Sequence, residues 1–172
     1  MNESARLIFA GLAGVLLLAS LAGALLRGKA GKGPSRAVVD RLNGRIRAWW
    51  LMALVIGGAL WAGTLAVVLL FGLVSFLALR EFLTLAPTRP GDHLALVVSF
   101  YLILPLQYLL VSMAWFEPFP LFIPVYAFLF LPILSALSGD IRHLQARAAQ
   151  TQWGLMLAVY CISHVPAILF PK

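Results

Sequence analysis

The sequence predicts an all-α, polytopic integral membrane protein, a helical bundle of about six transmembrane helices of which two form a short hairpin. The chain of 172 residues is 62% hydrophobic and only 11% charged, whereas soluble domains average about 45–50% apolar and about 25% charged residues. The charges stand in short islands between long uncharged runs. A bilayer requires this arrangement, because a charge at mid-membrane costs about 2.5–3.5 kcal/mol. We expect a single transmembrane domain over residues 1–172.

The first predicted helix covers residues 7–26. These 20 uncharged residues would form a helix of about 30 Å, the thickness of the hydrocarbon core. Ala22-Gly23-Ala24 resembles the cleavage site of a signal peptide, which is the alternative interpretation. However, Arg6 is offset by Glu3 before the run, and a dense basic island follows it. This asymmetry favours an uncleaved anchor with its N-terminus outside.

The island, residues 27–50, is predicted to be a basic cytoplasmic linker with a net charge of +6. Its first part, 27–35, is rich in Gly and Lys and is typical of a flexible linker. Its second part, 37–50, is predicted to be helical, with a candidate break at Asn43-Gly44. Trp49 and Trp50 end the island, where an interfacial aromatic belt is expected.

The uncharged run 51–79 has 29 residues, which as one helix would measure about 43 Å and exceed the membrane core. A hairpin with a turn near Gly57 to Gly63 removes this mismatch. The hairpin also places 11 of the 13 lysines and arginines on one side, with Arg6 and Lys172 on the other. Because cytoplasmic loops carry the excess of basic residues, we predict cytoplasmic basic loops and both termini outside.

The remaining helices of the segment 51–172 are predicted from three more uncharged runs, at residues 94–116, 119–139 and 153–171. Turn-forming clusters separate them at Pro87–Gly91 and Glu117–Pro120. In the polar loop before the last run, Ile141–Gln150 is a candidate short interfacial helix.

The basic balance, a net charge of +7, indicates lipid rather than nucleic acid as the partner. The aromatic residues lie in or beside apolar runs and do not alternate with basic residues as in a nucleic-acid platform. Phosphatidate or another anionic membrane lipid is the expected partner. The sequence contains no phosphate loop, HExxH motif or nucleophile elbow. Asp140 and His143 are only two candidate ligands, so no catalytic or metal residue is predicted.

Arg45 and Arg47 are the candidate contacts with a lipid phosphate. They precede the Trp pair at the expected membrane surface, and an arginine side chain can form two parallel hydrogen bonds to phosphate oxygens. The alternative is that both residues only set the topology.

Two pairs of polar residues are candidates for lining a cavity. Arg80 and Glu81 are adjacent at the end of an apolar run, where they could equally lie among the lipid headgroups. Ser163 and His164 lie inside the last run. Polar groups at that depth must be satisfied within the bundle, so a bond between helices is the alternative to a cavity.

Several segments between about residue 38 and residue 170 resemble the N-terminal half of the phosphatidate cytidylyltransferase family, which makes CDP-diacylglycerol. The order of these segments carries the resemblance, and no single one is specific. In chain order they are Arg45–Trp50, Ser75–Phe82, Phe122–Pro124, Ser138–Asp140 and the stretch from Trp153-Gly154 to Ser163-His164. The chain looks closest to a bacterial branch with one extra leading helix.

The resemblance implies a membrane nucleotidyltransferase of phospholipid biosynthesis, which converts CTP and phosphatidate into CDP-diacylglycerol and pyrophosphate. The family's signature follows this half, with a Lys-Arg pair, acidic residues and a His-Gly-Gly segment leading to Asp-Arg-x-Asp that holds a divalent metal, commonly Mg²⁺. The 172 residues do not contain that signature. We therefore expect the N-terminal portion of such a protein, inactive on its own.

Other functions stay open. The chain could be an accessory or structural membrane subunit, or a small transporter with Gln107 and His164 as its polar residues near mid-membrane. A separate catalytic half or a second copy of the chain is the expected protein partner. The resemblance implies the bacterial inner membrane as the location.

Overall fold

The computed structural model describes residues 3–29, 34–86, 90–137 and 144–169. These residues form six helices, and five of them are long and apolar enough to cross a membrane. The predicted all-helical fold is confirmed. The helices are α1 (Glu3–Lys29), α2 (Pro34–Ala62), α3 (Thr64–Leu85), α4 and α5 joined through a π-helical segment (His93–Ser112), α6 and α7 joined likewise (Phe119–Leu137), and α8 and α9 joined likewise (Leu144–Leu169).

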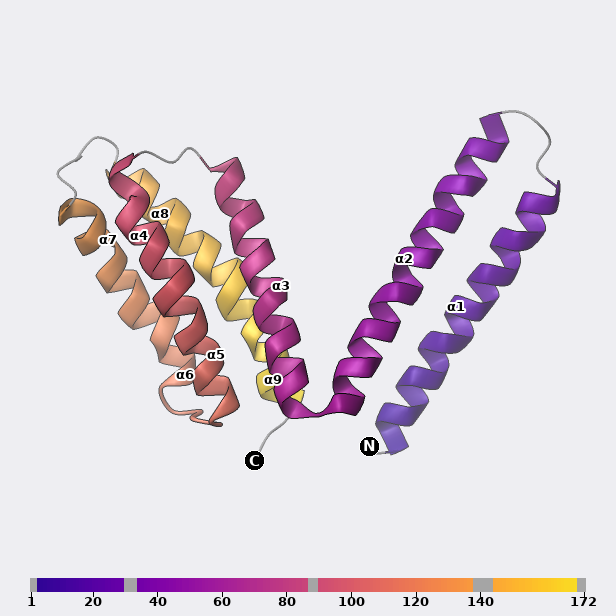
Figure 1. Cartoon of the computed structure of the whole chain (residues 1–172), viewed down its shortest axis with the longest axis horizontal. Coiled ribbons are helices and arrows are strands. Elements are labelled where there is room, and N and C mark those ends of the chain that lie inside the picture. Colours follow the sequence, from indigo (N-terminus) through magenta and orange to yellow (C-terminus); the bar gives the residue numbers. More distant parts are fainter. Residues whose placement is uncertain (1–2, 30–33, 87–89, 138–143, 170–172) are drawn as a thin grey trace. The chain divides into compact units, whose positions relative to one another are not determined.

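The chain divides into two compact units, Met1–Gly58 and Ala59–Lys172. In the first unit, α1 and α2 lie side by side (Figure 1). Small and polar residues join them: the Trp50 indole Nε1 donates to Ser20 Oγ at 3.0 Å. Gly23 is buried against Asn43, and a Cβ at Gly23 would collide with the Asn43 side chain. Small residues of this kind let membrane helices approach closely.

The candidate break at Asn43-Gly44 was wrong, because α2 continues through it as one helix to Ala62. The Asn43 side chain instead donates from Nδ2 to the Gly23 carbonyl of α1 at 3.4 Å. An asparagine is mildly unfavourable inside a helix, because its side chain competes for backbone hydrogen bonds. Here the hydrogen bond to α1 occupies the side-chain amide instead. The helical part of the basic island is therefore continuous with the apolar segment that follows it.

The predicted break in the 51–79 run is confirmed at Gly63. This residue separates α2 from α3 with φ 102° and ψ −176°. Such a backbone conformation is essentially restricted to glycine, because a Cβ would clash with the neighbouring peptide group. The apolar run is therefore two helices, as expected from its excess length.

In the second unit, α3 packs against α5, α8 and α9, and α7 packs against α8 and α4 (Figure 1). The core contains fully buried aliphatic side chains from three of the six helices: Leu79, Ile123, Leu131, Leu155 and Val159. Large aliphatic residues such as Leu69, Leu129 and Ile168 are exposed around the outside. An apolar exterior of this extent suits lipid as the surrounding solvent.

Prolines accompany the irregular turns of these helices. The π-helical segments are Ser99–Ile103, followed by Pro105; Phe122–Ala127, which contains Pro124; and Met156–Cys161, followed by Pro166. A proline lacks the N–H that would bond the carbonyl four residues earlier. At Pro132 the carbonyl left over is that of Phe128, and Gln152 Nε2 of α8 donates to it at 2.7 Å. A side chain of one helix thus completes the backbone bonding of its neighbour.

The candidate interfacial helix at Ile141–Gln150 was also wrong. From Leu144 onward its residues are the first turns of α8, which continues to Leu169 as one candidate membrane span. Thr151 and Arg147 are buried against neighbouring helices, so tertiary packing extends the helix through a polar stretch. Residues 141–143 lie outside the described part of the chain.

Candidate functional site

Arg45 and Arg47, both exposed on α2, form the first candidate site. Arg36 and Arg41 are exposed on the same helix. Arg45 follows Arg41 by one helical turn, so the two share a face. Arg47 is four residues from Asn43 and three from Trp50, both of which contact α1, so it lies on the side of α2 nearer α1. Arg45 and Arg47 therefore point to different sides of α2, and each could contact a separate phosphate.

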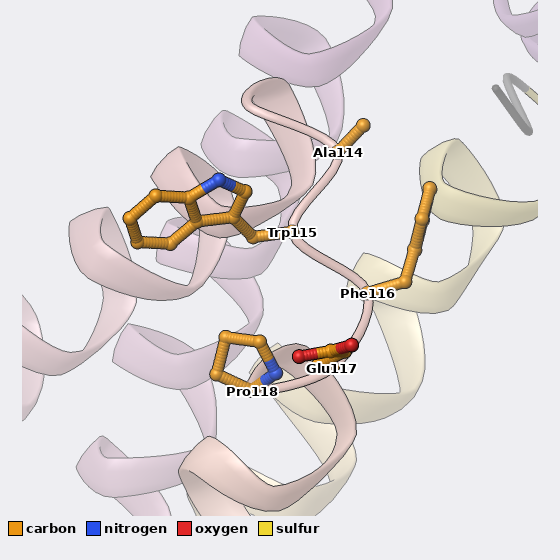
Figure 2. A pocket seen from close by; sticks show the side chains of 5 residues that line it. All are labelled: Ala114, Trp115, Phe116, Glu117 and Pro118. Atoms are coloured by element: carbon orange, nitrogen blue, oxygen red, sulfur yellow. The ribbon is translucent and has the colours of Figure 1, made fainter.

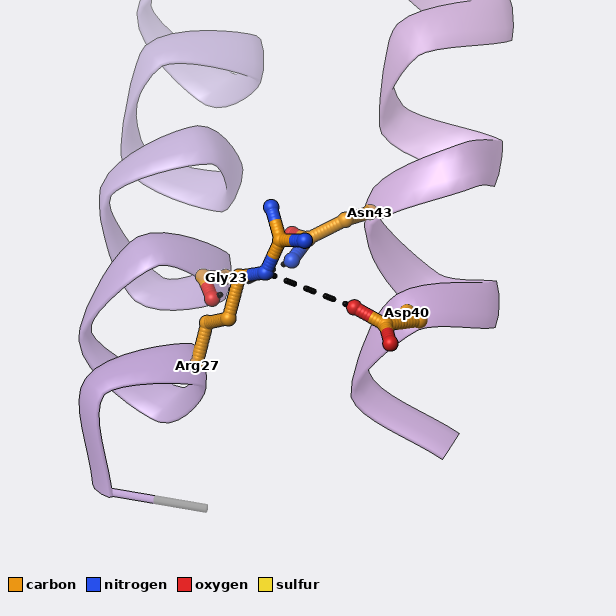
Figure 3. A network of polar contacts seen from close by, with 4 residues as sticks. All are labelled: Gly23, Arg27, Asp40 and Asn43. Carbon is orange, nitrogen blue, oxygen red and sulfur yellow. Dashed lines mark hydrogen bonds and ion pairs between the residues drawn. The ribbon is translucent and has the colours of Figure 1, made fainter. Parts of the chain in front are cut away.

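Polar contacts join α1 to the part of α2 that precedes these two arginines (Figure 3). Arg27 Nε lies 3.4 Å from Asp40 Oδ1, with about half of each side chain exposed. Exposed pairs of this kind contribute about 0–1 kcal/mol. The Arg27–Asp40 pair neutralises one basic charge of the island, and Arg41, Arg45 and Arg47 stay exposed further along α2.

Arg80 and Glu81 lie near the end of α3, and both are exposed. The Glu81 carbonyl accepts a bond from Thr84 Oγ1 at 2.7 Å, which is a local helix contact. Neither residue lines the hollow formed by residues 114–118. Their role in a cavity stays a prediction.

Ser163 lies in the fully buried interior. Gln107 Nε2 donates to Ser163 Oγ at 3.1 Å, and Ser163 Oγ donates to the Tyr160 carbonyl at 2.8 Å. Gln107 is itself fully buried, and its Oε1 has no hydrogen-bond partner within the described residues. The structure therefore gives Ser163 a bond between α5 and α9.

His164 is half-buried beside Ser163. Its Nδ1 lies 2.8 Å from the Tyr160 carbonyl, and since a carbonyl only accepts, Nδ1 carries the hydrogen. The ring also packs at 4.8 Å from the ring of Phe119 and at 4.5 Å from that of Tyr160. The histidine thus joins α9 to the start of α6, with Nε2 left as the second ring nitrogen.

The described residues contain no group of three His, Cys, Asp or Glu side chains that could hold a metal ion. Asp140 and His143, the two weak candidates from the sequence, lie outside the described residues. The described residues therefore show no cluster of this kind for a divalent metal.

Comparison with known proteins assigns the chain to a family. The model of the cytidylyltransferase family matches residues 43–171, which is most of the chain and includes every helix from the middle of α2 to α9. The chain belongs to the cytidylyltransferase family. The matched residues include Arg45, Arg47, Arg80, Glu81, Ser163 and His164, whereas α1 precedes them.

One relative of this cytidylyltransferase-family chain is described as the uncharacterized protein YnbB of Escherichia coli (strain K12). The two are 36% identical over 129 residues, which cover 73% of this chain and 40% of YnbB. The chain thus spans about two fifths of the length of that relative. No solved structure matches the chain.

Two buried contacts of the family chain were missed by the sequence reasoning. Ser75 Oγ and Tyr108 Oη lie 2.6 Å apart, and Tyr108 also donates to the Phe71 carbonyl at 2.9 Å. Asp92 Oδ1 lies 3.1 Å from Arg147 Nε, with both side chains about 95% buried. The sequence does show an acidic and a basic residue near the starts of two apolar runs. It does not show which helix ends lie together, so the pair could not be predicted.

Proposed function

We propose that the chain is the membrane-embedded N-terminal portion of a phosphatidate cytidylyltransferase-like protein. The observation that carries the proposal is the family match over residues 43–171. The apolar helices and the exposed arginines of α2 support it, because they suit a substrate that is itself an anionic lipid. By this proposal the chain supplies lipid-facing helices and is inactive alone.

The reaction of the complete protein joins a nucleotide to a lipid. An oxygen of the phosphatidate phosphate attacks the α-phosphorus of CTP, the bond from that phosphorus to the β-phosphate oxygen breaks, and pyrophosphate leaves. Such a transfer depends on positioned cations and, in the complete enzyme, on Mg²⁺. Among the described residues there is no group of three His, Cys, Asp or Glu side chains to hold that metal.

Arg45 and Arg47 are proposed to contact lipid phosphates at the membrane surface. Arginine binds phosphate through two donors at once, and the surface charge of anionic lipid attracts basic residues by about 1 kcal/mol each. Native mass spectrometry of the purified chain with phosphatidate tests this. Arg45→Gln or Arg47→Gln should weaken binding several-fold, while Arg36→Gln, a matched exposed arginine of α2, should have little effect. An equal loss of phosphatidate affinity in all three variants would mean that the arginines attract the lipid only through their total charge and form no specific site.

The location follows from the same charges. Eleven of the 13 basic residues fall on one side of a six-helix layout, and that side is proposed to be the cytoplasm. A bacterial inner membrane is the compartment that a phospholipid-synthesising protein of this kind would occupy. The predicted partners are membrane phospholipids, a separate catalytic half or a second copy of the chain.

A direct assay tests the proposed activity. The chain in lipid nanodiscs is incubated with phosphatidate, labelled CTP and Mg²⁺, and CDP-diacylglycerol is separated by chromatography. We expect no product from the 172 residues, and product when residues that carry the Asp-Arg-x-Asp signature are co-expressed as a second chain or joined in frame. Product from the 172 residues alone would contradict the proposal.

An accessory membrane subunit without catalysis is the second candidate. Transport is the weaker alternative and rests on the buried Gln107–Ser163 contact. Deletion of the gene, followed by measurement of CDP-diacylglycerol in the cells, separates the first two functions. Solute uptake into liposomes that contain only this chain would favour transport.

A further inference from the structure

The loop between α5 and α6 forms a hollow of about 580 Å³, lined by Ala114, Trp115, Phe116, Glu117 and Pro118. It joins two candidate membrane spans, one that ends at Ser112 and one that begins at Phe119. The hollow therefore lies at the membrane surface, at the depth of the lipid headgroups.

Backbone bonds fix the shape of this loop at both ends. At the end of α5, the Trp115 N–H donates to the Leu110 carbonyl at 3.0 Å and the Ala114 N–H to the Val111 carbonyl at 3.1 Å. This is the Schellman arrangement, in which the residue at Ala114, with φ 54°, is usually glycine. At the other end the Pro118 carbonyl accepts from the Phe122 N–H at 2.9 Å. The hollow is thus formed before any ligand arrives.

The chemistry of the lining favours a cation. Figure 2 shows the indole of Trp115 and the ring of Pro118 on one side of the loop, and the Glu117 carboxylate next to Pro118. Glu117 is exposed and makes no ion pair within the described residues. A carboxylate and an exposed tryptophan ring that line the same hollow can attract an ammonium group, by charge and by cation–π interaction respectively.

We propose that Trp115, Glu117 and Pro118 bind the ammonium group of a zwitterionic phospholipid headgroup, in the leaflet at this end of the bundle. Primary and quaternary ammonium headgroups share this chemistry. A lipid is the favoured source of the ammonium group, because the spans on both sides of the loop place the hollow within reach of headgroups. The exposed Trp115 can then stay in the interface while its indole contacts the cation.

Native mass spectrometry of the purified full chain tests the proposal with dioleoylphosphatidylethanolamine and, as an anionic reference without an amine, dioleoylphosphatidylglycerol. Glu117→Gln should lower the affinity for phosphatidylethanolamine about five- to tenfold and leave that for phosphatidylglycerol unchanged. Trp115→Leu should act in the same direction. Glu81→Gln removes another exposed carboxylate, and Trp153→Phe changes another exposed tryptophan, and neither variant should alter phosphatidylethanolamine binding.

Two outcomes would overturn the proposal. One is unchanged phosphatidylethanolamine binding in Glu117→Gln, a surface-loop variant that leaves the helices intact. The other is an equal loss of both lipids. A competition with soluble glycerophosphoethanolamine separates the sources of the headgroup. Displacement of the lipid only at a large excess of the soluble compound supports a lipid site, whereas displacement at equal concentration would identify a soluble amine as the ligand and reject the lipid.

Discussion

Gly63 determines where α2 ends and α3 begins. Its φ of 102° is accessible to glycine, whereas an L side chain at this position is strained by its own backbone, even though a Cβ would meet no residue beyond its chain neighbours within 4 Å. Gly63→Ala should therefore lower the free energy of unfolding by about 1–3 kcal/mol. The measurement is the equilibrium unfolding of the purified chain in mixed micelles, followed by far-UV circular dichroism.

Gly58→Ala is the matched control for this change. Gly58 is helical, and a Cβ there also meets nothing within 4 Å. Because glycine is a poorer helix former than alanine by about 1 kcal/mol, this variant should be as stable as the wild type or more stable. Equal destabilisation by the two variants would mean that the φ of Gly63 is not the cause.

The sequence predicted the break near Gly63 because a helix of 29 uncharged residues does not fit a bilayer. It could not predict the partner of a buried polar residue. Ser75 and Tyr108 stand 33 positions apart in two apolar runs, and only the packing of α3 on α5 brings their hydroxyl groups together. Ser163 was recognised as a polar residue that needs a partner, but its bond to Gln107 depends equally on helix packing.

Between elements, the buried ion pair of Asp92 and Arg147 joins the start of α4 to α8. If one residue of the pair is replaced, the charge of the other residue stays buried without its opposite charge. Such a loss destabilises the folded protein by about 3–5 kcal/mol. Asp92→Ala should therefore destabilise the chain strongly. The double variant Asp92→Ala, Arg147→Met should be less destabilised than the sum of its single variants, as chemical unfolding in micelles would show.

The exposed pair Arg27–Asp40 gives the control for the buried one. Its side chains are 51% and 49% exposed and lie 3.4 Å apart. Asp40→Ala should change the free energy of unfolding by less than about 1 kcal/mol, because solvent already screens the charges. Should Asp40→Ala prove as damaging as Asp92→Ala, burial would not be the source of the difference.

The contact of α8 with α3 is close at Gly154. A Cβ at this glycine would lie 2.8 Å from Phe82 Cδ1 and 3.4 Å from Leu79 Cδ1. Gly154→Ala should destabilise the bundle by about 1–3 kcal/mol through overpacking. Gly72→Ala is the matched change, because its Cβ would make ordinary contacts at 3.7 Å with the Tyr108 ring. Thermal unfolding in detergent should separate the two, and equal midpoints would contradict this account.

The extent of α2 and α8 could not be predicted from the sequence. In both helices a polar or basic segment continues into an apolar one, and the change in composition was interpreted as an end of the helix. The structure shows one helix in each case. Asn43 and Trp50 form hydrogen bonds with α1, and Arg147 forms an ion pair with Asp92. These contacts with neighbouring helices stabilise the helical conformation of segments whose composition alone is typical of a linker.

For the whole molecule, α2 determines the layout, because it is the one described long helix that is not among the five candidate spans. Its apolar end, Leu51 to Ala62, measures only about 18 Å. Crossing a core of about 30 Å would require Trp49, Trp50 and Arg47 to extend toward the headgroups or the bilayer to thin locally. If α2 crosses the membrane, the distribution of basic residues follows the positive-inside rule.

Reporter fusions decide whether α2 crosses the membrane. If α2 crosses, a reporter fused at Lys32 and one fused between residues 139 and 152 lie on the same side, and one at Lys172 lies on the opposite side. If α2 stays in the interface, the first two reporters fall on opposite sides, since every later helix is then inverted. We expect the first pattern, with the first two reporters cytoplasmic, because it places 11 of the 13 basic residues there. The second would limit this family chain to five crossings and move the Glu117 hollow to the other leaflet.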